Sequence, residues 1–320
     1  MKIIFFGTPD FAAGALQALL DSGHTVAAVV TQPDKAKGRS KTPVYSPVKE
    51  CAVKAGIPVL QPARVKSPDS VEALRAYEAD VFIVAAFGQI LSKEILDMPR
   101  LGCLNIHASL LPAYRGASPI QWAVINGEEK TGVTIMQMDE GVDTGDILYQ
   151  KEIKLDEKET GESLFEKLAV LGAEAIIEAL ELLPAGKLVR VAQCEEKATH
   201  TGMIHKDMGE IDWSMSAERL ERLVRGLNSW PSAFTFWEGK QLKIWESDVC
   251  KDEELSEEAE YEKKAAAGTV IKVEKNRFAV KCGEGALWIL SLQLEGKKRM
   301  RTLDFLLGNG IKQGSVFEGR

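Results

Sequence analysis

The stretch KIIFFG at Lys2–Gly7 is a continuous apolar run that ends in glycine, which is typical of a strand buried on both faces of a parallel sheet. Thr8, Pro9 and Asp10 follow and suit the first turn of a helix, where proline is tolerated and threonine can cap. Apolar residues then recur at helical spacing until Gly23. These residues therefore predict a strand, a turn and a helix, which together form the repeating unit of an α/β fold.

The same alternation continues through the first half of the chain. Apolar runs predict further strands at 25–31, 80–87, 102–108 and 131–138, and apolar periodicity predicts helices at 67–77, 120–126 and 162–183. Strands that alternate with helices predict a Rossmann-like, mostly parallel sheet. Functional residues in such sheets lie at the carboxyl ends of the strands.

The pattern changes beyond residue 188. Residues 189–211 show no clear period and are predicted to be a linker, and an amphipathic helix is predicted at 216–227. Short alternating segments with glycine-containing turns follow, as in a small antiparallel OB-like barrel, at 233–237, 241–245, 269–273, 277–281 and 286–292. We therefore expect a catalytic α/β domain at 1–188 and a smaller C-terminal β-barrel domain at 212–320.

The composition is that of a globular chain, with 45% hydrophobic and 27% charged residues in a length of 320. It excludes collagen-like, coiled-coil and largely disordered classes. No apolar run is long enough to span a membrane and no signal peptide is recognised, so we expect a cytoplasmic protein without a membrane partner. Five scattered cysteines without a C-x-x-C pair predict neither a disulfide framework nor a zinc ribbon.

The net charge of −7 comes from 40 basic and 47 acidic residues, which at first argues against a polyanionic partner. Residues 246–262 hold nine acidic residues and one basic residue, so this stretch carries −8 and the remainder carries +1. The charge pattern alone predicts a solvated loop for the acidic stretch. The net charge therefore does not exclude binding to a nucleic acid.

The candidate catalytic residues surround the end of one predicted strand. Asn105 and His107 are two residues apart and therefore share a face, where an amide and an imidazole suit a carbonyl oxygen that gains negative charge. Asp143 lies in the acidic turn 138–146 after another strand, and it can orient His107 if the two strands are neighbours. The alternative interpretation of His107 is a histidine with a purely structural role, and that of the turn 138–146 is a plain loop. The turn at Gly7 lacks the other glycines of a dinucleotide-binding motif.

Three ordered blocks resemble the signature of the folate-dependent formyltransferases. They are Asn105-x-His107, the segment SLLPAYRG at 109–116, and Asp143-Thr144-Gly145. Three further segments are similar to those of the members that formylate methionyl-tRNA, namely FGTPDFA at 6–12, TQPD at 31–34 and GEIDW at 209–213. The resemblance covers nearly the whole chain.

The resemblance implies transfer of a formyl group from 10-formyltetrahydrofolate to the α-amino group of methionine on the initiator tRNA, without a metal. Asn105 and a protonated His107 would donate to the oxyanion, while Asp143 would hold His107 in its cationic form and relay the amine proton. A monomer is expected. The implied folate-binding residues are Ser109, Leu110, Leu111, Pro112, Phe87, Gly88, Ile90, Asp139 and Val142.

Two basic clusters are implied to contact the tRNA. One cluster precedes Lys49 in a segment with five basic and no acidic residues between 35 and 49, and it consists of Lys35, Lys37, Arg39 and Lys41. The other lies in the expected barrel domain and consists of Lys297, Lys298 and Arg299. From charge alone, a solvated basic loop is the simpler interpretation of the first cluster.

Three alternatives stay open at this point. The same catalytic residues could serve a formyltransferase that acts on a small amine, either a purine precursor or an amino-sugar nucleotide. They could also serve a folate hydrolase that releases formate, or remain unused in a non-catalytic RNA-binding protein. The basic loop and the second domain favour tRNA over a small amine, and the intact set of Asn105, His107 and Asp143 favours an enzyme.

Overall fold

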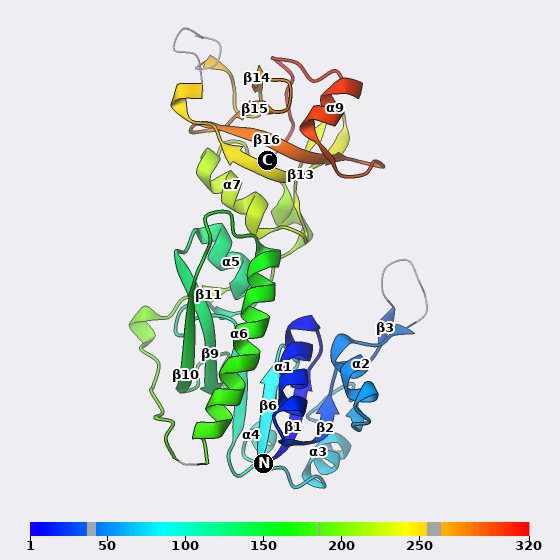
Figure 1. The fold of residues 1–320 in the computed structure, drawn as a ribbon, viewed down its shortest axis with the longest axis vertical. Coiled ribbons are helices and arrows are strands. Elements are labelled where there is room, and N and C mark those ends of the chain that lie inside the picture. Colours follow the sequence, from blue (N-terminus) through cyan, green and yellow to red (C-terminus); the bar gives the residue numbers. More distant parts are fainter. Residues whose placement is uncertain (37–42, 185, 255–263, 320) are drawn as a thin grey trace. The chain divides into compact units, whose positions relative to one another are not determined.

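The computed structural model describes residues 1–36, 43–184, 186–254 and 264–319 (Figure 1). The chain divides into two compact units. The first unit comprises Met1–Pro119, Lys130–Lys154 and Phe165–Thr201, and the second comprises Ile120–Glu129, Leu155–Leu164 and Gly202–Arg320. Two short segments from the middle of the chain therefore belong to the second unit.

A seven-stranded sheet with the order β10-β9-β7-β6-β1-β2-β5 forms the centre of the first unit. Its parallel strands are β1 (Lys2–Gly7), β2 (Thr25–Val30), β5 (Val59–Leu60), β6 (Val81–Ala85) and β7 (Cys103–His107). The remaining two are antiparallel, namely β9 (Lys130–Gln137) and β10 (Ile147–Lys154). The predicted mostly parallel sheet is thus confirmed, and β10 is an edge strand that the sequence pattern did not reveal.

Helices cover both faces of this sheet, and successive residues of each strand point to opposite faces. Phe11 of helix α1 (Asp10–Asp21) contacts Phe165 of helix α6 (Gly161–Leu182) with ring centroids 5.9 Å apart, and α6 packs against Ile106 of β7 at Gly172. Cys103 packs on the other face in a cluster with residues of α3 and α4. The helices of this unit are α1 (Asp10–Asp21), α2 (Pro47–Lys54), α3 (Pro68–Arg75), α4 (Lys93–Leu96) and most of α6 (Gly161–Leu182).

The turn after β1 differs slightly from the prediction. Helix α1 begins at Asp10, so Pro9 occupies the capping position, and its carbonyl accepts hydrogen bonds from the backbone N–H groups of Ala12 and Ala13. Two short ladders complete the unit. They pair β3 (Lys35–Ala36) with β4 (Pro43–Val44), and β8 (Arg115–Gly116) with β11 (His200–Thr201). The short helix η1 (Glu195–Lys197) precedes β11.

The second unit is built on an antiparallel sheet, as predicted. The strands follow the order β12 (Ala233–Trp237), β13 (Lys240–Val249), β16 (Ala286–Leu294), β15 (Phe278–Lys281) and β14 (Val270–Val273), with β17 (Met300–Arg301) paired to β16. The helices of this unit are α5 (Pro119–Asn126), η2 (Lys206–Gly209), α7 (Ala217–Gly226), η3 (Asp252–Glu254) and α9 (Thr302–Gly308).

Strand ladders do not close the second sheet into a barrel within the described residues. A segment near the C-terminus instead forms isolated bridges at both outer strands. Glu318 bridges Phe236 of β12, and Val316 bridges Thr269, which directly precedes β14. The predicted barrel is therefore seen only as an antiparallel sheet whose two edges share one bridging segment.

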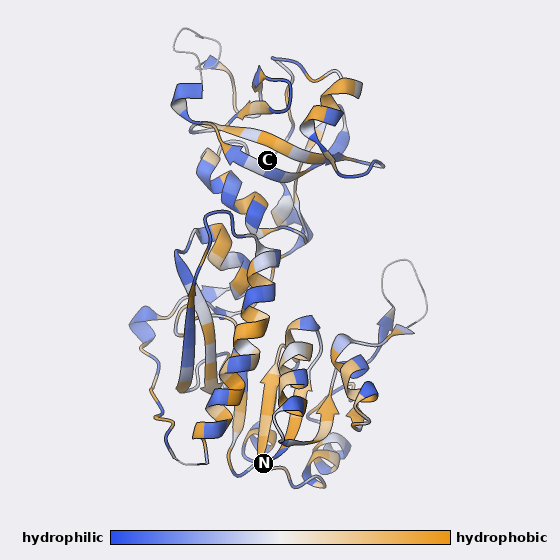
Figure 2. Ribbon diagram, in the orientation of Figure 1, coloured by the Kyte–Doolittle hydropathy of each residue, from blue (hydrophilic) through white to orange (hydrophobic). Residues whose placement is uncertain are grey.

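Hydropathy follows the layering of the first unit. Figure 2 shows that the central strands β1 and β6 are hydrophobic along their length, whereas β10 carries several hydrophilic residues. Within the described part of the chain, no helix combines the length and the apolar character that crossing a membrane requires. All five cysteines are free thiols.

Candidate active site

Asn105 and His107 lie on one face of β7, as their spacing predicted, while Ile106 points to the opposite face against α6. His107 is buried, with 7% of its side chain exposed. Its Nε2 donates a hydrogen bond to the Tyr114 carbonyl at 2.9 Å. Because a carbonyl only accepts, Nε2 carries a proton, and Nδ1 is the nitrogen that faces the neighbouring carboxylate.

That carboxylate belongs to Asp143, whose Oδ2 lies 3.6 Å from His107 Nδ1. This distance allows an electrostatic interaction but is too long for a hydrogen bond. The same oxygen accepts a hydrogen bond from the backbone N–H of Gly116 at 2.8 Å. The structure therefore brings together the three candidate catalytic residues, which the sequence separates by up to 38 positions.

The route by which Asp143 reaches His107 could not be predicted from the sequence. Strand β9 is antiparallel to β7, and Gln137 at its end lies opposite Leu104. The connection from β9 to β10 therefore starts beside the amino end of β7, and its Asp143 reaches His107 at the other end of that strand. Asp143 adopts a left-handed backbone conformation in this connection, with φ of +54°.

Unlike the side chains of His107 and Asp143, the Asn105 side chain has no hydrogen-bond partner among the described residues. It is half-buried, so its amide is not fully solvated. An amide supplies two donor hydrogens and one acceptor oxygen. Asn105 is therefore available to a carbonyl group that is placed over this face of β7.

Two residues that sequence reasoning missed support the loop after β7. Thr134 of β9 is fully buried; its hydroxyl donates to the Ser109 carbonyl at 2.7 Å and accepts from the Leu111 N–H at 3.0 Å. Gln150 of β10 donates to the Leu111 carbonyl at 2.9 Å. No signal in the sequence distinguished Thr134, because it is one of two threonines in β9, whose sequence is KTGVTIMQ. Ser109 itself donates its hydroxyl to the Ala113 carbonyl at 2.7 Å.

The implied folate-binding residues fall into two groups. Phe87 is buried and its ring contacts the core residue Phe6, with centroids 5.4 Å apart, so this ring supports the fold. By contrast, Ile90 is 75% exposed and Val142 is 61% exposed. Apolar side chains with this exposure can be covered by an apolar part of a ligand.

The remaining implied folate residues shape the backbone. Gly88 has φ of +83°, a conformation that glycine adopts without strain. Asp139 accepts hydrogen bonds from the Gly141 N–H at 3.0 Å and from the Thr144 hydroxyl at 2.7 Å, which stabilises the turn before Asp143. In the loop after β7, Leu111 is buried, whereas Leu110 and Pro112 are half-buried.

The structure describes only one residue of the first basic cluster, whereas it describes all of the second. Lys37, Arg39 and Lys41 lie outside the described residues, and Lys35 is exposed in β3. Lys49 is the fifth basic residue of this segment, and its charge is paired with a carboxylate just before the segment. Its Nζ lies 2.5 Å from Asp34 Oδ2 and 2.7 Å from Gln61 Oε1. This lysine donates a hydrogen bond that lowers the pKa of Asp34.

The second basic cluster lies in the second unit. Lys297 and Lys298 are exposed in the turn between β16 and β17. Arg299 is paired with Glu246, and its guanidinium carbon lies 5.1 Å from the centre of the Trp245 ring. Two lysines in this cluster therefore project freely toward solvent, whereas the arginine is held by a carboxylate and an aromatic ring.

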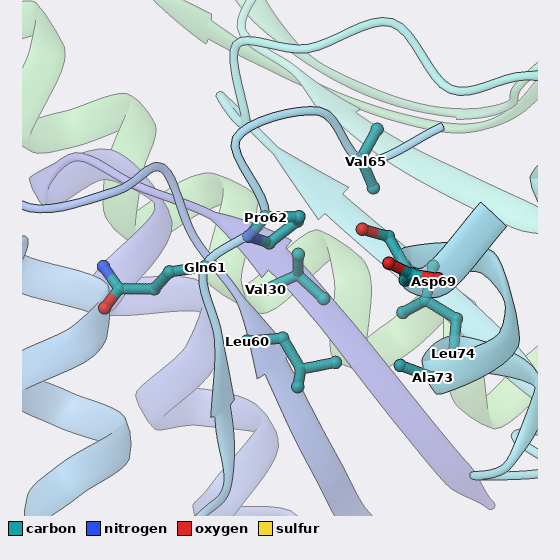
Figure 3. A pocket seen from close by; sticks show the side chains of 9 residues that line it. Val30, Leu60, Gln61, Pro62, Val65, Asp69, Ala73 and Leu74 are labelled. Carbon is teal, nitrogen blue, oxygen red and sulfur yellow. The ribbon is translucent and has the colours of Figure 1, made fainter. Parts of the chain in front are cut away.

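A pocket of about 220 Å³ lies among β2, β5 and α3, apart from the candidate catalytic residues (Figure 3). Its described lining is mainly apolar and contains none of the implied folate-binding residues. It is smaller than typical sites for drug-sized ligands, which hold about 300–1,000 Å³. The lining consists of Val30, Leu60, Gln61, Pro62, Val65, Asp69, Ser70, Ala73 and Leu74.

No group of three or more His, Cys, Asp or Glu side chains that could hold a metal ion occurs in the described ranges.

Comparison with known families agrees with the division of the chain into two parts of different fold. Residues 1–180 match the family described as formyl transferase, and residues 203–310 match the family described as the formyl transferase C-terminal domain. The chain therefore belongs to the formyl transferase family.

Individual relatives give a more specific comparison. The chain is 55% identical over 314 residues to the methionyl-tRNA formyltransferase of Lachnospira eligens, which covers 98% of each protein. It is 52% identical over 317 residues to the methionyl-tRNA formyltransferase of Agathobacter rectalis, which covers 99% of each.

A solved structure shares the fold at lower identity. HypX from Aquifex aeolicus, determined in complex with tetrahydrofolic acid, matches with a TM-score of 0.63 and 19% identity over 98% of this chain. The chain spans 48% of the length of HypX. At this identity the likeness establishes the fold alone.

Proposed function

We propose that the protein transfers a formyl group from 10-formyltetrahydrofolate to the α-amino group of methionine on the initiator tRNA. The observation that carries this proposal is the convergence of Asn105, His107 and Asp143 on one face of β7. Identity over nearly the full length with enzymes named methionyl-tRNA formyltransferase supports the tRNA acceptor over a small amine. The protein would act as a monomer in the cytoplasm, where translation begins.

The nucleophile needs little activation. An α-amino group has a pKa of about 7.7–8.0, so a useful fraction is neutral near pH 7. Its nitrogen attacks the formyl carbon, and the carbonyl π electrons move to the oxygen to form a tetrahedral oxyanion. Collapse of this intermediate reforms the carbonyl and breaks the bond between the formyl carbon and the folate nitrogen. The amine loses one proton, and the departing folate nitrogen gains one.

Asn105 and His107 have different roles in this proposal. The unbonded Asn105 amide donates directly to the oxyanion, and one such donor is worth about 2.7–4 kcal/mol. His107 already donates its Nε2 hydrogen to the Tyr114 carbonyl. In this arrangement the imidazolium therefore stabilises the oxyanion mainly through its positive charge, which differs from the direct hydrogen bond of His107 that the resemblance implies.

Asp143 has two roles in this proposal: it stabilises the positive charge on His107 and it accepts the proton of the amine. Its Oδ2 faces His107 and accepts the Gly116 N–H, so this oxygen stabilises the cationic ring. Its Oδ1 has no hydrogen-bond donor among the described residues. We assign Oδ1 as the acceptor of the amine proton, through an intervening water.

The substrate-binding surfaces follow from the same proposal. Ile90, Val142 and the 109–112 loop would contact the folate, and Lys297 and Lys298 would contact phosphates together with the 35–41 cluster. Contacts of this kind position a nucleic acid without reading its sequence. The bridges of the C-terminal segment to both outer strands support a barrel-like, OB-like form of the second sheet.

The decisive experiment is a formyl-transfer assay with labelled 10-formyltetrahydrofolate and four acceptors. These are methionyl-tRNA, free methionine, an amino-sugar nucleotide and water. We expect label in methionyl-tRNA alone, and none when the donor or the methionyl group is omitted. Efficient labelling of the sugar nucleotide, or release of labelled formate at the same rate without tRNA, would contradict the proposed acceptor.

A further inference from the structure

Arg115 is a charged residue that the reaction described above does not use. It lies in β8 with only 1% of its surface exposed. Its two terminal nitrogens donate to the Glu195 carboxylate at 2.9 and 2.7 Å, and its Nε donates to Gln193 Oε1 at 2.9 Å. A buried guanidinium is stable only when such partners replace its lost hydration, so its position and orientation are closely defined.

The contact with Arg115 determines how the Gln193 amide is oriented. Arg115 Nε only donates, so the amide oxygen of Gln193 must face it and the amide nitrogen must face away. That nitrogen donates to the Asp143 carbonyl at 2.8 Å and to the Gly145 carbonyl at 2.7 Å. All three hydrogen bonds would be lost if the amide turned over, so Gln193 has one stable orientation.

The two carbonyls held by Gln193 flank a strained part of the chain. Asp143 has φ of +54°, which is uncommon for a residue with a side chain. A Cβ atom at Gly145 would lie 1.8 Å from the Gln137 carbonyl oxygen, so the backbones approach closely there. Such conformations persist only when the surroundings hold them in place.

The segment that carries Gln193 is itself attached to the sheet. Val191 exchanges backbone hydrogen bonds with Ile147 at the start of β10, both 2.9 Å long. The residue that follows Arg115 in β8, Gly116, donates its N–H to Asp143 Oδ2. Adjacent residues of β8 thus hold Asp143 in two ways, one directly at its carboxylate and one through Gln193 at its backbone.

We propose that Gln193 is a positioning residue for formyl transfer, because its amide holds the Asp143 backbone so that the carboxylate stays beside His107. This inference rests on the proposed function and extends it to the segment 189–211, which the sequence alone presented as a linker. Gln193 touches no reacting atom in this scheme. It acts on the rate through the distance between Asp143 and His107, because the interaction of two charges weakens as that distance grows.

The first test replaces Gln193 with methionine, which has a similar length and no N–H group. We expect Gln193→Met to lower kcat about tenfold while KM for each substrate changes by less than about twofold, since substrate contacts remain. Gln193→Glu keeps an acceptor for Arg115 but loses both donors, so it should reduce kcat similarly and serves if Gln193→Met is unstable. Gln17→Met, at an exposed position in α1, is the matched control and should retain wild-type kcat.

A double-mutant cycle separates positioning from general loss of stability. If Gln193 acts through Asp143, then adding Gln193→Met to Asp143→Asn should change kcat by less than about twofold. Independent, multiplicative losses would overturn the proposal. So would a Gln193→Met enzyme with kcat equal to that of the Gln17→Met control.

A spectroscopic test needs no activity. In ligand-free protein labelled with ¹⁵N-histidine, the His107 ring signals are identified by their loss in His107→Asn. We expect these signals to move in Gln193→Met and to stay unchanged in Gln17→Met, because only the first change displaces Asp143. Unmoved signals would overturn the positioning role. If they move but the wild type formylates no methionyl-tRNA, the positioning stands and the proposed acceptor fails.

Discussion

Gly116 donates its backbone N–H to Asp143 Oδ2 at 2.8 Å. Gly116 has φ of +100°, and a Cβ atom on it would lie 2.5 Å from the Thr201 carbonyl oxygen. Both the conformation and the close approach therefore require glycine. The carboxylate of a candidate catalytic residue thus depends on a backbone conformation that no other residue adopts without strain.

The first prediction concerns this glycine. Gly116→Ala should lower the free energy of unfolding by about 1–3 kcal/mol and reduce kcat by more than about tenfold, because the clash displaces the N–H that holds Asp143. Urea unfolding and the formylation assay measure the two effects. The matched control is Gly14→Ala in α1, where the nearest atom to a new Cβ is 4.0 Å away and stability should be unchanged or slightly higher. Wild-type turnover in Gly116→Ala would contradict the role of this contact.

A second prediction separates activity from stability at Asn105. Asn105→Ala should reduce kcat by about 10²–10³, the cost of losing one oxyanion donor. Because no described residue bonds this amide, the free energy of unfolding should change by less than about 0.5 kcal/mol. Asn309→Ala is the opposite case, since Asn309 donates to the Phe305 carbonyl at 2.9 Å in the second unit. It should lose about 1 kcal/mol of stability with kcat unchanged.

A third prediction concerns pH and Glu254. Hydrogen bonds from the Lys251 backbone N–H, from Trp288 Nε1 and from Arg277 lower the pKa of Glu254 from 4.5 to about 2. Since the pKa is lower in the folded protein, ionised Glu254 stabilises the fold above about pH 4.5, and this contribution is lost as the pH falls toward 2.

Urea unfolding followed by tryptophan fluorescence tests this pH dependence. Glu254→Gln should be less stable than the wild type at pH 7, and the difference should shrink between pH 4.5 and 2. The exposed neighbour Glu253 provides the control, and Glu253→Gln should show no such pH-dependent difference. A stability difference that stays constant down to pH 2 would show that the carboxylate charge of Glu254 is not the cause.

A fourth prediction addresses the basic cluster at 35–41. Arg39→Ala should raise KM for methionyl-tRNA at least about fivefold and leave KM for the folate donor unchanged, because phosphate contacts act on the tRNA alone. Binding of methionyl-tRNA should also become less sensitive to salt: the slope of log K for tRNA binding against log salt concentration should be smaller in magnitude by about one. Lys54→Ala, an exposed position at the end of α2, should change neither quantity. Equal effects on both substrates would contradict the role of this cluster.

The sequence by itself determined the mostly parallel sheet of the first unit, the antiparallel strands of the second unit and the family. The strands at 2–7 and 25–30 and the helix at 10–21 follow from apolar periodicity, which is a local property of neighbouring residues. The shared face of Asn105 and His107 follows equally from strand geometry. Strand β10 escaped prediction because an edge strand alternates between partly buried and exposed residues instead of forming an apolar run.

Tertiary structure alone decided how the candidate site is assembled. Asp143 reaches His107 because β9 is antiparallel to β7 and its connection folds back, an outcome set by strand pairing and not by local composition. Likewise, Gln193 holds the Asp143 carbonyl across 50 positions of sequence, from a segment without any periodic pattern. Hydrogen bonds between residues this distant leave no trace in periodicity, because each partner is an ordinary polar residue until the fold brings the two together.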